Sequence, residues 1–279
     1  MSYISRSPNS KKRERKIGHR RVDKDGKVTY KKTPFETLGL AMQHAIVTTL
    51  SASNTSNTDR DILMDDFQTV ESFNFLEKGT EGVTPGHNYG DFEFKIYAAN
   101  AFRYFRKAFE VSEGDFLKSI GDPKDSPLVS LSNPGASGSL FWKTGDDQFI
   151  IKTIDSGEAS FLKSLLPGYY MNLTQNKRTL LPKFYGLYQI TTAHQKNIRL
   201  MVMSNLIPST MPMHWTFDLK GSLHGRRASK KEQAKKRPVW KDLDWQEKLS
   251  SKKDGIGRVF NFEVSEPAPS KIWRIESLF

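Results

Sequence analysis

The sequence predicts a fold of the α+β class, with an antiparallel sheet and flanking helices. Three observations support it: apolar and polar residues alternate along 92–97, two apolar segments flank a Gly-Asp-Asp turn within 140–154, and apolar residues recur every three or four positions along 35–49. A period of two is typical of a strand, and a period near 3.6 is typical of an amphipathic helix. With 279 residues, of which 37% are hydrophobic, the chain can bury a sizeable core.

The elements of the first half are expected in a simple order. Residues 1–32 form a basic, flexible tail. The elements after it are a helix with Thr33-Pro34 as N-cap and first residue, a linker over 51–59, strands over 62–76 and 91–98, a short helix capped by Asn100, and a helix capped by Ser112 with Asp115.

The second half begins with a change of composition near residue 130. Its expected elements are a Gly/Ser-rich loop over 133–139, a strand from 140, a turn at 145–147, a strand over 149–154, a helix that ends at Pro167-Gly168 with Phe161, Leu162, Leu165 and Leu166 on one face, and strands over 183–190, 198–207 and 213–219.

Charge is distributed unevenly along the chain. The net charge is +12, with +9 in residues 1–32 and +8 in residues 220–253, so the remainder is mildly acidic. Such zones suit a polyanion: a lipid headgroup layer, nucleic acid or a nuclear import receptor. A solvated tail and loop without a specific partner is the alternative. The absence of cysteine excludes disulfides and Cys-ligated metals, and the six histidines lack metal-ligand spacing.

A strand, a glycine loop, a second strand and a lysine carry the strongest chemical signal. Gly135 and Gly138 precede Lys152 by 17 and 14 residues, which is about one hairpin. Small residues let backbone N–H groups approach the phosphates of ATP, and a lysine on the next strand can neutralise their charge. In protein kinases a carboxylate of the following helix holds that lysine, and Glu158 begins the next helix here. The spacing does not fit a Walker loop, and a plain hairpin with a surface lysine is the alternative.

A second cluster follows in residues 217–238. Asp218 and Lys220 are two apart on a predicted strand, so they point the same way and can face a bound phosphate; a structural ion pair is the alternative. Arg226 and Arg227 begin a basic loop, and guanidinium groups bind phosphate in a bidentate manner. A solvated charged loop and a nuclear import signal are the other interpretations.

Together these stretches resemble the phosphatidylinositol phosphate kinases, above all the type I (phosphatidylinositol 4-phosphate 5-kinase) branch. The resemblance covers about residues 15–245 and is carried by the segments 16–20, 101–106, 135–141, 149–153, 165–188, 217–222 and 226–229. It implies a kinase-like, SAICAR synthase-like fold: an ATP-binding N-lobe over 33–205, the start of a C-lobe over 206–245, and a divergent tail over 246–279.

The resemblance also implies roles for individual residues. Those implied to bind ATP are Gly135, Ala136, Ser137, Gly138, Ser139, Lys152, Met203, Asn205 and Leu206. Lys152, Asp218 and Lys220 are implied to be catalytic, with Glu158 as the partner of Lys152. Lys220, Arg226 and Arg227 are implied to bind phosphate or the lipid headgroup.

The implied activity is transfer of the ATP γ-phosphate to phosphatidylinositol 4-phosphate, with Mg²⁺. The implied partners are ATP, an anionic phosphoinositide membrane, and a second copy or a full-length kinase in a dimer, with no specific nucleic acid. The implied location is cytoplasmic, at the inner face of the plasma membrane, with the nucleus as alternative. The family's catalytic-loop and magnesium aspartates have no counterpart in the printed sequence, so we expect a chain that lacks most of its C-lobe and is weak or inactive alone. The rival hypotheses are a non-catalytic fragment that binds membrane and kinase, and a basic nucleic-acid-binding protein.

Overall fold

The structure is a computed structural model that forms two compact units, Met1–Pro208 and Ser209–Phe279. It describes residues 15–17, 20–23, 26–31, 33–53, 60–122, 125–131, 138–176, 178–179, 181–192, 196–206 and 215–251.

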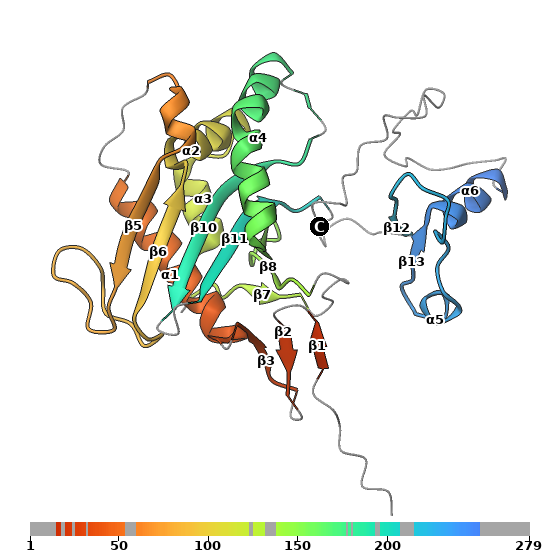
Figure 1. Ribbon diagram of the computed structural model, residues 1–279, viewed down its shortest axis with the longest axis horizontal. Coiled ribbons are helices and arrows are strands. Elements are labelled where there is room, and N and C mark those ends of the chain that lie inside the picture. Colours follow the sequence, from red (N-terminus) through yellow and green to blue (C-terminus); the bar gives the residue numbers. More distant parts are fainter. Residues whose placement is uncertain are drawn as a thin grey trace, which may run out of the picture. The chain divides into compact units, whose positions relative to one another are not determined.

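The described residues of the first unit form two antiparallel sheets (Figure 1). The smaller sheet runs in the order β1 (Arg15–Ile17), β2 (Arg20–Val22), β3 (Val28–Tyr30), β4 (Thr33–Pro34). The larger sheet runs in the order β5 (Val70–Phe75), β6 (Phe92–Tyr97), β10 (Phe184–Thr192), β11 (Asn197–Ser204), β9 (Phe149–Ile154), β8 (Phe141–Lys143), β7 (Val129–Ser130). The helical elements are α1 (Phe35–Ser53), the 3₁₀ turn η2 (Met64–Phe67), α2 (Ala99–Ala108), α3 (Glu113–Ile120) and α4 (Ser156–Gln175).

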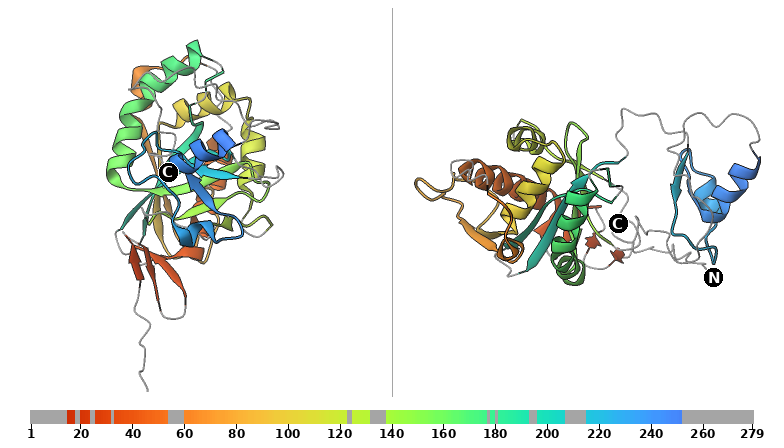
Figure 2. Two further views of the ribbon diagram at one scale, coloured as in Figure 1. Left: turned by 90° about the vertical axis from the view of Figure 1, so that its right-hand side faces the viewer. Right: turned by 90° about the horizontal axis from the view of Figure 1, so that it is seen from above.

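Helices cover both faces of the larger sheet. Helix α4 lies on one face, whereas α1 and α3 lie on the other (Figures 1 and 2). The main core includes apolar side chains of α1, α3 and the strands; its fully buried members include Met42, Ile46, Phe94, Phe116, Ile151 and Leu200. Alternation along β9 therefore directs Ile151 into this core and Lys152 toward α4.

The amino-terminal region departs from the prediction. Residues 15–17, 20–22 and 28–30, expected within a flexible tail, form three strands that pair with one another. Thr33 and Pro34, expected to start the helix, form β4 and pair with Tyr30 and Thr29. Proline lacks the N–H that an inner strand donates, but β4 is an edge strand, where proline is tolerated. Helix α1 begins one residue later, at Phe35.

Local hydrogen bonds correct two further predictions. Residues 64–67, expected to belong to a strand over 62–76, form the 3₁₀ turn η2, and the strand begins at Val70. Asp66 stabilises this turn by accepting from the guanidinium of Arg60 and from the backbone amide of Leu63. Asn100 does not cap α2, because Ala98 occupies the N-cap position. The side-chain amide of Asn100 instead donates to the carboxylate of Asp66 over 2.9 Å. The predicted Ser112 cap is confirmed, since its hydroxyl accepts from the Asp115 amide.

Helix α4 does not end at Pro167-Gly168 as predicted. It continues to Gln175, because a buried stripe continues past the proline. The members of this stripe are Leu162, Leu166, Tyr169 and Leu173. Tyr169 also donates to the carbonyl of Pro182 over 2.7 Å, and this packing outweighs the one backbone hydrogen bond that proline removes. Phe161, expected on the apolar face, is exposed.

The second unit is small. Strands β12 (Thr216–Asp218) and β13 (Val239–Lys241) are parallel, and helices α5 (Lys230–Gln233) and α6 (Asp242–Ser251) accompany them. Aromatic rings supply its apolar contacts: Phe217 meets Trp245 edge-on at 4.9 Å. The strand predicted over 213–219 is thus present but shorter, and the part of the tail over 246–251 lies in α6.

Candidate functional site

Lys152 is an ion-paired charge inside the first unit. Its side chain is 1% exposed, and Nζ lies 2.9 Å from Oε1 of Glu158. In the sheet it stands opposite Phe141 of β8 and Met201 of β11, so strands on both sides fix its position. A lysine is almost never buried without a partner, and Glu158 supplies the opposite charge.

Glu158 is itself held by the start of α4. Its second oxygen, Oε2, accepts from the Asp155 amide, and the Asp155 carboxylate accepts from the Glu158 amide, each over 2.8 Å. This capping box leaves Oε1 to face Lys152. Glu158 was predicted from the sequence, whereas Asp155 was not, although the Asp-x-x-Glu spacing was an available signal.

The described end of the glycine-rich stretch is tied to the strand that carries Lys152. Gly138 has a left-handed φ of 70°, a conformation that glycine adopts without strain. Leu140 then donates its amide to the hydroxyl of Thr153 over 2.8 Å, and its carbonyl accepts from the Thr153 amide over 3.0 Å. Ser139 is buried beside it. Gly135, Ala136 and Ser137 lie outside the described residues.

The end of β11 carries the residues expected near adenine. Met203 is buried, Leu206 is exposed, and Asn205 joins this end to the β8–β9 turn. The backbone N–H of Asn205 donates to the backbone carbonyl of Gln148 over 2.8 Å. The side-chain amide of Asn205 donates to the backbone carbonyl of Asp147, also over 2.8 Å. These hydrogen bonds join the segment 203–206 to the hairpin that carries Lys152.

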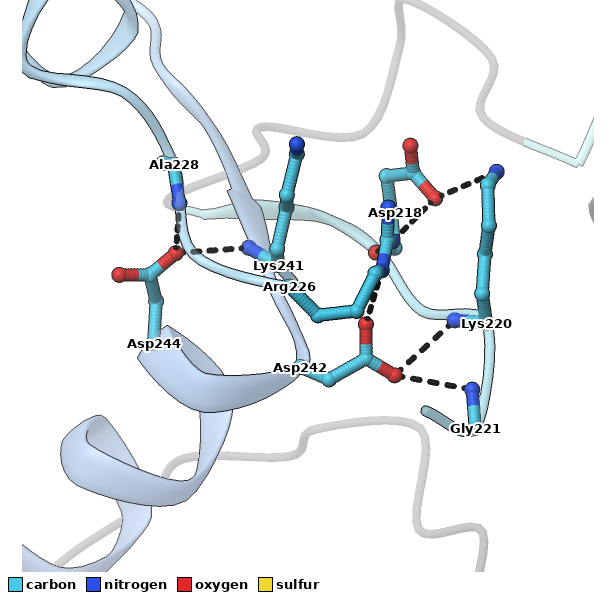
Figure 3. Close-up of polar contacts among 8 residues, drawn as sticks. All are labelled: Asp218, Lys220, Gly221, Arg226, Ala228, Lys241, Asp242 and Asp244. Carbon is cyan, nitrogen blue, oxygen red and sulfur yellow. Dashed lines mark hydrogen bonds and ion pairs between the residues drawn. The ribbon is translucent and has the colours of Figure 1, made fainter. Parts of the chain in front are cut away.

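Charged residues of the second unit form a network around β12 (Figure 3). Asp218 accepts from Lys220 over 2.9 Å and from Arg226 over 2.7 Å. Arg226 also donates through Nε to Asp242 over 2.8 Å. The structural ion pair proposed as the alternative for Asp218 and Lys220 is therefore present.

Asp242 is the residue of this network that sequence analysis missed. Its second oxygen accepts from the amides of Lys220 and Gly221 over 3.0 and 2.9 Å, so it fixes the turn after β12 (Figure 3). Asp244 likewise accepts from the backbone amides of Ala228 and Lys241 through one carboxylate oxygen. An Asp-x-Asp pattern at a helix start was the available signal, since such side chains accept backbone N–H groups.

Electrostatics keep the network charged. Burial by itself would raise the pKa of Asp242, but hydrogen bonds from Arg226 and from backbone amides hold that pKa below its usual range. Burial would likewise lower the pKa of Arg226, and the hydrogen bonds to Asp242 and Asp218 raise it instead. Arg226 thus pairs with both Asp218 and Asp242 and is largely buried. The side chains of Lys220 and Arg227 are also ion-paired, but they are 43% and 47% exposed.

Two kinds of site are not found in the described part of the chain. Its His, Asp and Glu side chains form no group of three or more that suits a metal ion. Within the same residues, no helix is both long and apolar enough to cross a membrane.

Comparison with known proteins adds a family match. The family model Phosphatidylinositol-4-phosphate 5-Kinase matches residues 123–264. Phosphatidylinositol 4-phosphate 5-kinase type-1 alpha of Rattus norvegicus is 54% identical over 231 residues, which are 83% of this chain and 41% of that protein. The type-1 beta protein of Homo sapiens is 54% identical over 217 residues, 78% of this chain and 39% of that protein. The chain therefore spans about two fifths of the length of these relatives.

Proposed function

Since the chain belongs to the phosphatidylinositol-4-phosphate 5-kinase family, we propose that it binds ATP and takes part in transfer of the γ-phosphate to phosphatidylinositol 4-phosphate. The product is phosphatidylinositol 4,5-bisphosphate. One observation carries the proposal: a buried lysine, paired with a helix carboxylate, on the hairpin that follows a glycine-rich stretch.

Lys152 is proposed to contact the ATP phosphates. Because its side chain is almost fully buried, its charge acts where water screens little. Glu158 directs the ammonium group and remains anchored by the cap of α4 when the lysine also contacts phosphate. The segment 203–206 is proposed to lie beside the adenine ring.

Magnesium is proposed to accompany ATP, because phosphoryl transfer uses it to neutralise phosphate charge. The described residues do not offer a fitting ligand group for it, so none is assigned as its ligand.

The second unit is proposed to bind anionic phosphate through the exposed cations Lys220 and Arg227. Arg226 is proposed to orient Asp218, since it donates to both Asp218 and Asp242. Each Lys or Arg near an anionic leaflet contributes about 1 kcal/mol, which supports a peripheral location at the inner face of the plasma membrane. A dimer with a second copy or a longer kinase stays a prediction, and so does the alternative nuclear location.

The test is ATP-dependent phosphorylation of vesicles that contain phosphatidylinositol 4-phosphate, together with calorimetric Mg-ATP binding and vesicle sedimentation. Lys152→Ala is the test variant, and Lys95→Ala, which removes a partly exposed lysine paired with Glu93, is the control. Turnover that only Lys152→Ala abolishes would support the proposal. ATP binding without turnover would restrict this chain to the nucleotide-binding step. Vesicle binding without ATP binding would favour a non-catalytic membrane-binding fragment and overturn the proposal.

A further inference from the structure

The turn between β8 and β9 is hydrogen-bonded to Asn205, the residue that follows β11. We propose that Asp147, in this turn, is a positioning residue for the nucleotide site: by holding Asn205, it sets the place of the segment 203–206 relative to the hairpin that carries Lys152. The inference rests on the proposed function, because it assumes that ATP contacts both the segment and the lysine.

Three hydrogen bonds from Asn205 carry the inference. Its backbone N–H donates to the carbonyl of Gln148 over 2.8 Å. Its side-chain nitrogen donates to the carbonyl of Asp147 over 2.8 Å and to Oδ1 of Asp147 over 3.1 Å. An asparagine side-chain nitrogen has two protons, so these two acceptors can take both of them. Asn205, implied by the family resemblance to bind ATP, thus directs this nitrogen at the turn.

Asp147 has an uncommon backbone conformation. Its φ is 65°, in the left-handed region that residues other than glycine seldom adopt, although aspartate tolerates it better than most. The residue is buried, and its Oδ1 also accepts from Nζ of Lys143 over 2.7 Å. A left-handed conformation costs free energy and persists where surrounding contacts fix it. The bonds to Lys143 and Asn205 are contacts of this kind.

The same turn is also bonded to α3. Oδ1 of Asp146 accepts from the hydroxyl of Ser119 on α3 over 2.7 Å and from the hydroxyl of Thr144 over 2.6 Å. Both of these hydroxyl residues are buried. Asp147 therefore joins Asn205 to a turn that is itself attached to the helical layer of the first unit.

The place of Asn205 depends on the turn because strand pairing ends before it. The last paired residues of β9 and β11 are Phe149 and Ser204, so Asn205 and Leu206 lie beyond the ladder. Lys152 lies three residues after Phe149, which is about 10 Å along the strand. An ATP molecule that contacts the lysine with its phosphates and the segment 203–206 with its base depends on this spacing.

The test compares Asp147→Gly and Asn205→Ala with the unaltered 279-residue chain. Glycine keeps the left-handed conformation and removes the carboxylate, whereas alanine removes both side-chain bonds of Asn205. Each substitution should speed hydrogen exchange at the backbone amide of residue 205 and weaken Mg-ATP binding, each by about fivefold. The double variant should add little, because the two side chains act as one unit. Asp147→Asn keeps an acceptor oxygen and should behave like the unaltered chain.

Inorganic tripolyphosphate separates positioning from a general loss of stability, because it carries phosphates but no base. Its affinity, measured with Mg²⁺, should be the same for the unaltered chain and both variants, since Lys152 keeps its place. Equal weakening of ATP and tripolyphosphate binding would overturn the inference. So would weakening of ATP binding by Asn205→Ala but not by Asp147→Gly, which would show that Asn205 contacts ATP directly.

Asn100→Ala is the matched control, since it removes an asparagine side chain that donates to Asp66 elsewhere in the first unit. It should change neither exchange at residue 205 nor ATP affinity, and the same two effects there would overturn the inference. An unaltered chain that binds neither Mg-ATP nor tripolyphosphate would overturn the proposed function and this inference with it. An unaltered chain that binds Mg-ATP no more tightly than Asp147→Gly would overturn the inference alone.

Discussion

The Lys152–Glu158 pair of the first unit and the Asp218–Arg226–Asp242 network of the second unit are held in different ways. Lys152 is buried in a seven-stranded sheet, and strand register fixes its backbone on both sides. The network of the second unit lies around a two-stranded sheet, and Asp242 accepts two backbone amides from a separate turn, whereas Glu158 accepts one amide within the cap of its own helix. In the first unit the fold positions the charges, whereas in the second the charges help to form the fold.

This difference sets the cost of substitution. A charge that a large core holds in place loses mainly its own partner when that partner is replaced. A carboxylate that accepts backbone N–H groups in a small unit loses the turn as well. The side chains of Lys220 and Arg227 in the second unit are exposed, so their ion pairs should contribute little to its stability.

The largest effect is expected for Glu158→Gln, which leaves the buried ammonium of Lys152 without this carboxylate. The free energy of unfolding of the first unit should fall by about 3 kcal/mol, because breaking a buried ion pair by removing one member is costly. Segment-resolved hydrogen exchange in urea would measure it. Lys152→Met is the counterpart: it removes the buried charge and should cost less stability, yet weaken ATP binding about 100-fold. If Glu158→Gln costs no more than Glu93→Gln, whose carboxylate pairs with the partly exposed Lys95, the comparison fails.

Asp242→Asn should have the next largest effect, confined to the second unit. It weakens charge-assisted bonds to Arg226 and two backbone amides, so that unit should lose about 2 kcal/mol. Exchange should accelerate in β12 and α6 while the core strands of the first unit stay protected. Glu247→Gln is the control: Glu247 lies on α6, as Asp242 does, and is an exposed partner of Arg227. This substitution should change the stability of the second unit little. Equal acceleration in both units would contradict the prediction.

Acidification should lower the free energy of unfolding of the two units at different pH values. Each change should be smaller than those expected for the substitutions above. Burial lowers the pKa of His87 despite the charges of Glu77 and Asp91, so the unfolded chain binds this proton first and the first unit should begin to lose stability below about pH 6.5. The lowered pKa of Asp242 contributes stability that persists down to about pH 4 and is lost as pH falls further through the folded value. Urea unfolding at pH 7, at pH 5.5, at pH 4 and below pH 4, followed by hydrogen exchange, would test the order. His87→Gln should abolish the earlier change.

The smallest effect on stability is expected for Lys220→Met. Its side chain is 43% exposed, so the free energy of unfolding of the second unit should change by less than about 0.5 kcal/mol. Binding to anionic vesicles should nevertheless weaken and become less dependent on salt. A large loss of stability would show that Lys220 belongs to the structural network rather than to the phosphate-binding surface.

Local patterns predicted much of the first unit. Alternation along 92–97 gives β6, the Gly-Asp-Asp turn gives the β8–β9 hairpin, and Lys152 and Glu158 meet as the order of strand and helix suggested. These features depend on residues close in sequence, where period, turn chemistry and capping act directly. The Ser112 cap was predictable for the same reason.

The errors occur where burial and pairing in the folded unit outweigh the local sequence signal. Residues 15–17, 20–22 and 28–30 form strands because they pair with one another and Tyr30 enters the core. Asn100 binds Asp66 instead of capping its own helix. Helix α4 passes Pro167 because its buried stripe continues beyond it.

The sequence by itself determined the class of fold, the lysine hairpin and the two basic zones, since composition and spacing act locally. Only the tertiary structure decided that Tyr30 packs in the main core with residues of α1 and of the larger sheet, and that Asp242 closes the turn after Asp218. Such contacts join residues far apart in sequence, and their energy depends on burial and on competing hydrogen bonds that no local pattern records.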